Sequence, residues 1–346
     1  MPAKGIYIYG IVPNLYSTDI FRSLENSEVY AISFQNISAI VSERESAHID
    51  FLDRESLGRL LVHHQKTIEE IMGKGFAMFI PMKLGTVFSS KKDAIKILEN
   101  GHDLIINTLK KIEYLTEIDL AVSWADFPAT INDIAADPEI IAMKDDILIK
   151  TDTHLKIDQV KAGMLVQKKL IEKNKQIELN ILDSLTAYSI DIKIHDVFND
   201  QMITNSAFLI NRDKKDKFEQ AIDKLDEEFN SALNFKIVGP LPCYSFYTLE
   251  VKKLNVDHVL LAKNELGLGE ETSESEIKKA YLEKAKLFHP DAQMENGDEE
   301  NFNRISKAYH TMLDYSASAR QSSNMNLISL TKENVIENLI LVKIKE

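Results

Sequence analysis

Hydrophobic and polar positions follow two different periods along this chain, and the changes between them mark its parts. In the first third, β-branched and aromatic residues alternate as in strands, at segments 6–12, 29–33, 37–42, 76–88 and 118–124. Apolar residues recur at helical spacing from 54 to 74, and again after Ser90 to about Leu115. Strands and helices in this mixed order predict an α+β sandwich, with one sheet covered by helices. We expect this first domain to span residues 1–126.

The same pattern returns after a long helix. Residues 155–188 contain almost no helix breaker, so they predict one continuous helix within a helical connector at 127–188. Alternation then predicts strands at 189–195, 206–210, 235–238 and 245–251, and helical spacing of the apolar residues predicts an amphipathic helix at 214–229. A second, smaller α+β domain is therefore expected at 189–254. We assign the ferredoxin-like type to both α+β domains.

After residue 254 the pattern becomes helical. Ser273 and Glu276 have the spacing of a capping box, so a helix should begin close to Ser275. Pro290 disfavours helical geometry at His289 and should end that helix. Matching apolar stripes then predict two antiparallel helices, with the first stripe at 277, 281, 285 and 288 and the second at 302, 305, 309 and 312. We expect an all-α helical hairpin module at 255–320.

The last segment, 321–346, is expected to be a linker and a tail. Serines at 316, 318, 322 and 323, together with Asn324, predict a polar linker. The apolar run at 339–344 predicts a strand that returns to one of the sheets.

Composition narrows the class of protein. The 346 residues are 44% hydrophobic and 27% charged, as in ordinary globular proteins of two or three domains. A net charge of −13 would repel a phosphate backbone, so we expect no nucleic-acid binding. The single cysteine, Cys243, cannot form an intramolecular disulfide, which fits a reducing compartment. No apolar run approaches twenty residues, so we expect a cytoplasmic protein without a membrane span.

One stretch of the helical region carries a recognisable motif. Residues 276–281 precede the tripeptide His289, Pro290 and Asp291, and Phe302, Ile305, Ala308 and Tyr309 follow at matching intervals. This stretch, from about 256 to 315, resembles the J-domain, the co-chaperone module that recruits DnaK-type ATPases. The resemblance implies that the tripeptide contacts a DnaK-type partner.

The helix before the tripeptide is basic. Lys278, Lys279, Lys284 and Lys286 stand against Glu283, so this short segment carries a charge of +3 in an acidic protein. Such a basic face suits an acidic partner. A second interpretation stays open, in which the tripeptide only caps a helical hairpin and the lysines form a solvated surface.

Other blocks, within residues 1–252, resemble a second family. They are 7–12, His64, 81–88, 117–124, 202–209 and 239–246. These blocks are similar to those of the gas-vesicle accessory family GvpF/GvpL. The sequence departs from the family pattern at 82–84, Leu241 and Cys243. Two of these blocks contain residues whose first interpretation is a structural turn: Gly85 and Thr86 in one, and Gly239, Pro240 and Pro242 in the other. The alternative is that these turns shape a groove for a partner.

Enzymatic motifs are missing from the sequence. It has no phosphate-binding loop, no nucleophile elbow and no GxGxxG after a strand. His63 and His64 lack the spacing of a zinc site, and Cys243 has no evident base partner. We therefore expect no catalytic residue, no metal and no cofactor.

The two resemblances together imply a function. They imply a cytoplasmic, gas-vesicle-associated assembly protein that binds hydrophobic shell subunits and other vesicle accessory proteins, and that recruits a DnaK-type chaperone. One alternative is a minor structural component of the shell with a J-fold that has no co-chaperone activity. Another is a general co-chaperone unrelated to vesicles.

Overall fold

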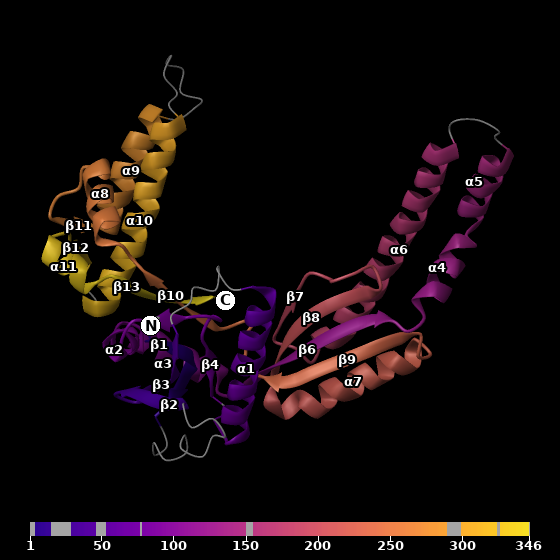
Figure 1. Cartoon of the computed structure of the whole chain (residues 1–346), viewed down its shortest axis with the longest axis horizontal. Helices are drawn as coiled ribbons and strands as arrows, with labels where there is room; N and C mark the ends of the chain where they lie inside the picture. Colours follow the sequence, from indigo (N-terminus) through magenta and orange to yellow (C-terminus); the bar gives the residue numbers. More distant parts are fainter. Residues whose placement is uncertain are drawn as a thin grey trace. The chain divides into compact units, whose positions relative to one another are not determined.

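The computed structural model describes residues 4–14, 29–45, 53–76, 78–149, 155–288, 299–323 and 326–345. They form mixed α and β structure in two compact units (Figure 1). The first unit joins the two ends of the chain, residues 1–113 and 247–346, and the second comprises residues 114–246. The first unit is therefore discontinuous in sequence.

The amino-terminal sheet of the first unit is antiparallel and has the order β2-β3-β1-β4, with β5 also paired to β1. Its strands are β1 (Lys4–Pro13), β2 (Val29–Phe34), β3 (Ile37–Glu45), β4 (Ile80–Pro81) and β5 (Val87–Phe88). Central strands β1 and β3 are almost wholly buried: consecutive positions 5–12 and 37–42 are buried, so both faces of these strands are covered. This order, with a β2–β3 hairpin before the first helix, is not the ferredoxin-like order expected for this domain.

Three helices accompany that sheet: α1 (Arg54–Gly73), α2 (Lys91–Asn100) and α3 (His102–Ile112). Asp53 and Ser90 begin α1 and α2 by accepting hydrogen bonds from Ser56 N–H and Asp93 N–H. The single helix expected from 91 to 115 is broken at Gly101, a residue of low helix propensity.

The sheet of the second unit has the order β7-β8-β6-β9, all antiparallel. Its strands are β6 (Leu115–Trp124), β7 (Asp191–Ile194), β8 (Met202–Asn211) and β9 (Leu233–Leu241), and α7 (Lys215–Glu228) packs against it. This strand order is the ferredoxin-like one. The structure therefore differs from the expected boundary at residue 126, because β6 lies inside this sheet. Alternation identified β6 as a strand, but it carries no information about the partner strand.

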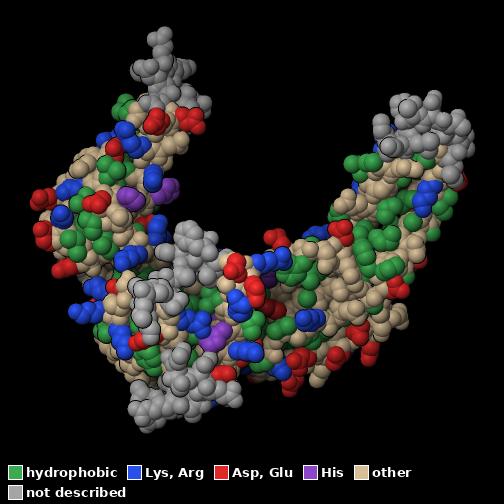
Figure 2. Space-filling model, in the orientation of Figure 1, with side chains coloured by type: hydrophobic (Ala, Val, Ile, Leu, Met, Phe, Trp, Pro, Cys, Tyr) green, Lys and Arg blue, Asp and Glu red, His purple; other side chains and the backbone are tan. Residues whose placement is uncertain are grey.

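A helical arm follows β6 and consists of α4 (Phe127–Ala135), α5 (Pro138–Ile149) and α6 (Leu155–Thr186). Ile134, Ile140 and Leu170 form a small core that joins the three helices. The carboxyl-terminal half of α6 packs on the sheet through Ile181 and Leu185. Residues 127–188 were expected to connect two domains, but they link β6 and β7 within one sheet. Apolar side chains also remain on the surface of the arm (Figure 2).

The carboxyl-terminal region completes the first unit. It contains β10 (Thr248–Lys253), α8 (Val256–Leu266), β11 (Glu271–Ser273), α9 (Glu274–Phe288), α10 (Glu299–Ser323), β12 (Leu327–Ser329), α11 (Lys332–Glu337) and β13 (Ile340–Lys345). Strand β13 pairs with β10 from Thr248–Lys345 to Lys253–Ile340. The 245–251 strand was expected in the second α+β domain, but β10 belongs to the first unit because its partner is the tail.

The polar linker expected near residue 320 is instead the end of a helix. Helix α10 continues to Ser323, and Ser316 and Ser318 are buried. Ser318 Oγ donates to Ile340 O over 2.8 Å. A serine side chain is small and can satisfy its hydroxyl locally, so it fits a close contact between a helix and a strand.

Candidate functional site

Helix α9 is the element that carries the sequence-predicted interaction residues. The capping box is present, because Glu276 Oε2 accepts from Ser273 N–H over 2.7 Å and Glu276 N–H donates to Ser273 Oγ over 3.3 Å. The hydrogen bonds from Ser273 hold the pKa of Glu276 below its ordinary value. Ile277 is fully buried, and Tyr281 stacks on Tyr309 of α10 with ring centroids 4.2 Å apart. The helix is thus fixed at its start and along its inner face.

The four lysines of α9 divide into two kinds. Lys278, Lys279 and Lys286 are exposed, and helical spacing places them on one face of α9. Lys284 is half-buried and donates to Glu265 O at the end of α8. Only the three exposed lysines are therefore placed to meet a partner. The sequence could not separate Lys284 from the others, because its role depends on where α8 packs.

The tripeptide His289, Pro290 and Asp291 lies outside the described residues. Helix α9 is described to Phe288, the residue before His289. The second helix of the hairpin, α10, is described from Glu299.

The helical module is tied to the amino-terminal sheet region by β13. Asn100 Nδ2 at the end of α2 donates to Ile340 O over 2.9 Å, and Gln321 of α10 bonds both N–H and C=O of Val342. The carboxylate of Asp314 joins α10 to β10 and β13, because it pairs with Lys252 of β10 at 2.5 Å and with Lys343 of β13 at 2.7 Å. Burial acts to raise the pKa of Asp314, but the two lysines outweigh it and hold that pKa below its ordinary value. Sequence reasoning missed Asn100 and Asp314, because their partners lie far along the chain.

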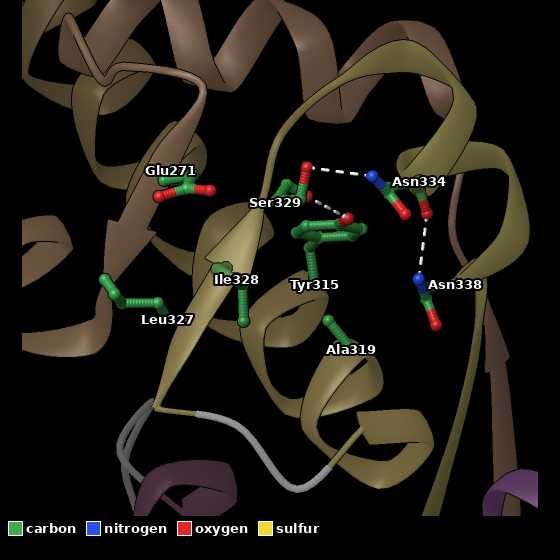
Figure 3. Close-up of a pocket in the computed structure, with 8 residues that line it drawn as sticks. All are labelled: Glu271, Tyr315, Ala319, Leu327, Ile328, Ser329, Asn334 and Asn338. Carbon is green, nitrogen blue, oxygen red and sulfur yellow. Dashed lines mark hydrogen bonds between the residues drawn. The ribbon is translucent and has the colours of Figure 1, made fainter.

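A cavity of about 370 Å³ opens beside the module between α10, β12 and α11 (Figure 3). Its polar groups bond one another: Tyr315 Oη donates to Ser329 O over 2.7 Å, and Asn334 Nδ2 donates to Ser329 Oγ over 2.9 Å. Asn338 Nδ2 donates to Asn334 O over 2.9 Å. Burial raises the pKa of Tyr315 to about 12. The polar groups of α10, β12 and α11 are thus engaged in structural hydrogen bonds, and the charged residue that lines the cavity is the exposed Glu271 of β11.

Gly85 and Thr86 form a turn in the first unit. Gly85 has φ of +78°, which glycine adopts without strain. Thr86 N–H and Oγ1 both donate to Lys83 O, and Thr86 O accepts from Ile8 N–H over 3.1 Å. These bonds hold the turn against β1, so the geometry is that of a structural turn.

Gly239 and Pro240 lie inside strand β9 of the second unit instead of in a turn, and Pro242 follows the last residue of that strand. The register of β6 against β9 shifts here, and Gly239 has φ of +150°. A Cβ at Gly239 would approach Glu117 O to 3.0 Å, so only glycine fits without adjustment. Pro240 is exposed, whereas Pro242 is buried. The Gly85 turn and the β9 irregularity at Gly239 belong to different units, and each has a local structural role.

Glu117 explains why this block is held against β6, and sequence reasoning did not single it out. Its side chain is buried and accepts hydrogen bonds from Ser245 N–H and Ser245 Oγ, both over 2.8 Å. Burial and the neighbouring Asp119 raise the pKa of Glu117, and the Ser245 bonds oppose them. The available signal was a carboxylate at a core position of an alternating strand.

Tyr7 and Tyr9 are fully buried and bond to the histidines of α1. Tyr7 Oη lies 2.7 Å from His64 Nδ1, and Tyr9 Oη lies 3.1 Å from His63 Nε2. Burial lowers the pKa of His64 to about 4, so the ring is neutral at pH 7. Among the described residues, no group of three or more His, Cys, Asp or Glu side chains could hold a metal ion. This cluster is a polar core contact.

No helix within the described part of the chain is both long and apolar enough to cross a membrane.

Comparison with known proteins gives two matches on separate parts of the chain. The family described as gas vesicle synthesis protein GvpL/GvpF matches residues 5–248, and the DnaJ domain matches residues 264–320. Gas vesicle protein F1 of Halobacterium salinarum is 22% identical over 250 residues, which cover 72% of this chain and 95% of the relative. The chaperone protein DnaJ of Staphylococcus carnosus is 47% identical over 49 residues, which cover 14% of this chain and 13% of DnaJ.

Solved structures resemble the larger part. The crystal structure of the gas vesicle protein GvpF from Anabaena sp. PCC7120 superposes with a TM-score of 0.59 and 20% identity, and the match covers 70% of this chain and 97% of that one. The GvpF structure from Microcystis aeruginosa gives a TM-score of 0.56, also at 20% identity, and covers 70% of this chain and 98% of that one. These structures share the fold of the two α+β regions.

Proposed function

The chain belongs to the gas vesicle synthesis protein GvpL/GvpF family and carries a DnaJ domain at residues 264–320, and from this premise we propose that it is an accessory protein of gas-vesicle assembly. In this proposal it binds hydrophobic shell subunits, acts together with other vesicle accessory proteins, and recruits a DnaK-type chaperone. It performs no bond chemistry of its own, requires no cofactor, and works in the cytoplasm in association with vesicles.

The proposed holding role follows from the chemistry of the client. Apolar, strand-rich surfaces aggregate unless another protein covers them or delivers them under control. We assign the holding role to the α+β regions, because they make up the part that matches the vesicle family. The turn at Gly85 and Thr86, and the irregular end of β9 with Gly239, Pro240 and the following Pro242, are structural features of these regions.

The proposed recruiting role rests on one observation, the basic face of α9. Lys278, Lys279 and Lys286 are exposed on one side of a helix that is capped and packed, in a protein with a net charge of −13. A concentrated positive face on an acidic protein favours an acidic partner surface. The match to the DnaJ domain supports a DnaK-type ATPase as that partner, and we propose that His289, Pro290 and Asp291 lie at the contact.

Stimulation of the ATPase tests this role. We expect the native protein to stimulate the DnaK-type ATPase of its host, and His289→Gln to lose that stimulation while still binding the shell subunit. The substitution keeps Pro290 and the apolar stripes, so stability should change by less than about 0.5 kcal/mol. Absence of stimulation by the native protein would leave the module without co-chaperone activity.

Charge reversal gives a second readout with a matched control. Replacing Lys278 and Lys279 by Glu should weaken the stimulation, because like charges would then face each other across the contact. Stimulation by the native protein should also fall as ionic strength rises. Lys332→Glu on α11, also an exposed lysine of the first unit, should leave the stimulation unchanged.

The alternative role as a minor shell component predicts a different fractionation. A structural component stays with vesicles through repeated washing, whereas an assembly factor is released. We expect the washed vesicles to lose this protein, and its retention in constant proportion to the shell subunit would favour the structural role.

A further inference from the structure

The helical arm of the second unit leaves a line of large apolar side chains in water. Val160, Met164 and Ile171 of α6 are 56%, 62% and 59% exposed. Their spacing of four and seven residues places them on one face of the helix. Helices α4 and α5 cover a different face of α6, through Leu170 and its neighbours. The surface of this arm is visibly apolar (Figure 2).

The segment between β7 and β8 extends this apolar surface. Phe198 is 81% exposed, and the adjacent Val197 is also exposed. The backbone around them is fixed, because Asn199 Oδ1 accepts from the N–H groups of Gln201 and Met202, each over 3.1 Å. Further bonds join Asn205 Nδ2 to Asp196 O and Asn174 Nδ2 to Asp200 O. The side chains of Val197 and Phe198 are thus exposed to solvent on a segment whose backbone is fixed by local hydrogen bonds.

A groove of about 340 Å³ lies between α6 and this segment. Its apolar lining is Leu170, Ile171, Val197, Met202 and Ile203. An apolar surface of this kind, continuous with a helical stripe, is typical of a docking site for another chain.

The charges at the rim of the groove indicate what kind of chain it takes. Lys175 pairs with Glu178 over 2.8 Å, so these two charges compensate each other. Asp196 and Asp200 also line the groove, and no ion pair joins either to a basic side chain of the described residues. The rim therefore carries uncompensated negative charge beside apolar walls.

We propose that this groove, together with Val160 and Met164, is the client-docking surface, and that it binds an amphipathic helix flanked by lysine or arginine. The apolar face of that helix lies against α6 and Phe198, and its basic flank meets Asp196 and Asp200. The exposed stripe from Val160 to Ile171 is about 16 Å long, which suits three turns of helix. The proposal rests on the proposed holding function, whose client site it locates.

A second copy of this chain is a poorer occupant. In a symmetric dimer the same patch meets itself, which would bring Asp196 and Asp200 of the two copies together. Like charges at such a contact oppose association.

Peptide binding to the full-length protein tests the docking surface directly. The probe is a fluorescent 18-residue amphipathic helix with a leucine face and lysine flanks, and its matched control has glutamate in place of every lysine. We expect the lysine peptide to bind at least tenfold more tightly than the glutamate peptide. Ile171→Asp combined with Phe198→Asp should weaken the lysine peptide at least tenfold, and Asp196→Asn with Asp200→Asn should reduce the preference between the peptides.

The matched control is Leu261→Asp, an equally exposed apolar residue on α8 in the other unit, which should bind both peptides as the native chain does. All these positions are on the surface, and an unchanged thermal midpoint would show that the variants fold. Equal binding of the two peptides, or undiminished binding by the Ile171 and Phe198 variant, would overturn the proposal. So would a native dimer that Phe198→Asp dissociates.

Shell-subunit aggregation separates this proposal from the function beneath it. If the native chain suppresses aggregation and the Ile171 and Phe198 variant does so equally well, the docking surface is wrong and the holding function stands. If the native chain does not suppress aggregation, the holding function fails, and the peptide result alone decides whether the groove binds amphipathic helices. Suppression that is lost only in the variant supports both.

Discussion

At the scale of single residues, the second unit contains a buried carboxyl that favours its protonated form. Glu117 is 1% exposed, and Asp119 follows two residues later on the same strand. Burial is the largest cause that raises the pKa of Glu117, and the charge of Asp119 raises that pKa further. Ser245 stabilises the carboxyl by two hydrogen bonds, so Glu117 joins β6 to the block that follows Gly239.

This carboxyl predicts a pH dependence of stability. Its pKa in the folded chain lies above the ordinary value of 4.5, so the folded state binds the proton more tightly than the unfolded state. The stabilising contribution is complete below pH 4.5 and is lost as the pH rises through the raised pKa, by at most about 1.4 kcal/mol per pH unit for one proton. We expect urea midpoints between pH 5 and 9 to fall less for Glu117→Gln than for the native chain.

The control for that series is Asp223→Asn on the exposed side of α7, which should keep the native pH profile. Parallel profiles for the native chain and Glu117→Gln would contradict the prediction.

Glycines give a second prediction at this scale. A Cβ at Gly10 would overlap the ring of Phe79 and the carbonyl oxygen of Ile80, both parts of a closely packed core. Gly10→Ala should therefore destabilise the amino-terminal sheet by about 1–3 kcal/mol or more. Gly58 in α1 has nothing within 4 Å of its Cβ position, so Gly58→Ala should stabilise by about 0.5–1 kcal/mol. Thermal unfolding of both variants checks the opposite signs.

At the scale of elements, local sequence and tertiary contacts determine different features of α9. The capping box begins the helix, and this signal is readable from Ser273 and Glu276 alone. The stack of Tyr281 on Tyr309 and the bond from Lys284 to Glu265 O need the packed module. The start of the helix is therefore determined by local sequence, whereas tertiary packing determines which of its lysines are exposed.

The cap can be tested by hydrogen exchange. Ser273→Ala removes the hydroxyl that accepts from Glu276 N–H, and such losses typically cost about 1 kcal/mol. We expect faster amide exchange in the first turn of α9, with little change in α10. Glu283→Ala, an exposed change further along α9, should leave that first turn protected. Unchanged exchange in Ser273→Ala would mean that packing at Ile277 alone holds the helix start.

Much of the element content could be predicted from the sequence, because alternation and helical spacing are local. The β2–β3 hairpin, α1, α6 and α7 correspond to predicted segments. Strand partners could not be predicted: β6 pairs with β8 and β9 instead of the amino-terminal sheet, and β10 pairs with β13. Local pattern also failed where tertiary contacts overrode it, as at the buried serines of α10.

The candidate site was predictable to a similar degree. The local charge balance led to four lysines, of which Lys278, Lys279 and Lys286 are exposed on one face and Lys284 is half-buried. The groove beside α6 was not predicted, because its walls come from Leu170 and Ile203, two positions that only the folded sheet brings together.

At the scale of the whole molecule, one compact unit is built from both ends of the chain. Residues 247–346 complete the unit that residues 1–113 begin. The contacts are specific: Asn100 Nδ2 donates to Ile340 O, and Met82 forms a bridge with Leu249. The helical module is therefore held by its last strand as well as by the chain that enters it.

This arrangement predicts that a short truncation at the carboxyl terminus destabilises segments that lie far away in the sequence. Deleting residues 340–346 removes β13, which pairs along the whole of β10 and accepts bonds from Asn100 and Ser318. Apolar Leu341 and Val342 are buried there, so their removal exposes core surface beneath α2 and α10. We expect amide exchange to accelerate in β10, at the end of α2 and in the last turns of α10. Strands β6 to β9 belong to the other unit and should keep their native protection, which provides the internal control. If exchange accelerates equally in both units, the truncation has unfolded the chain as a whole; if it accelerates in neither, β13 does not hold the module in place.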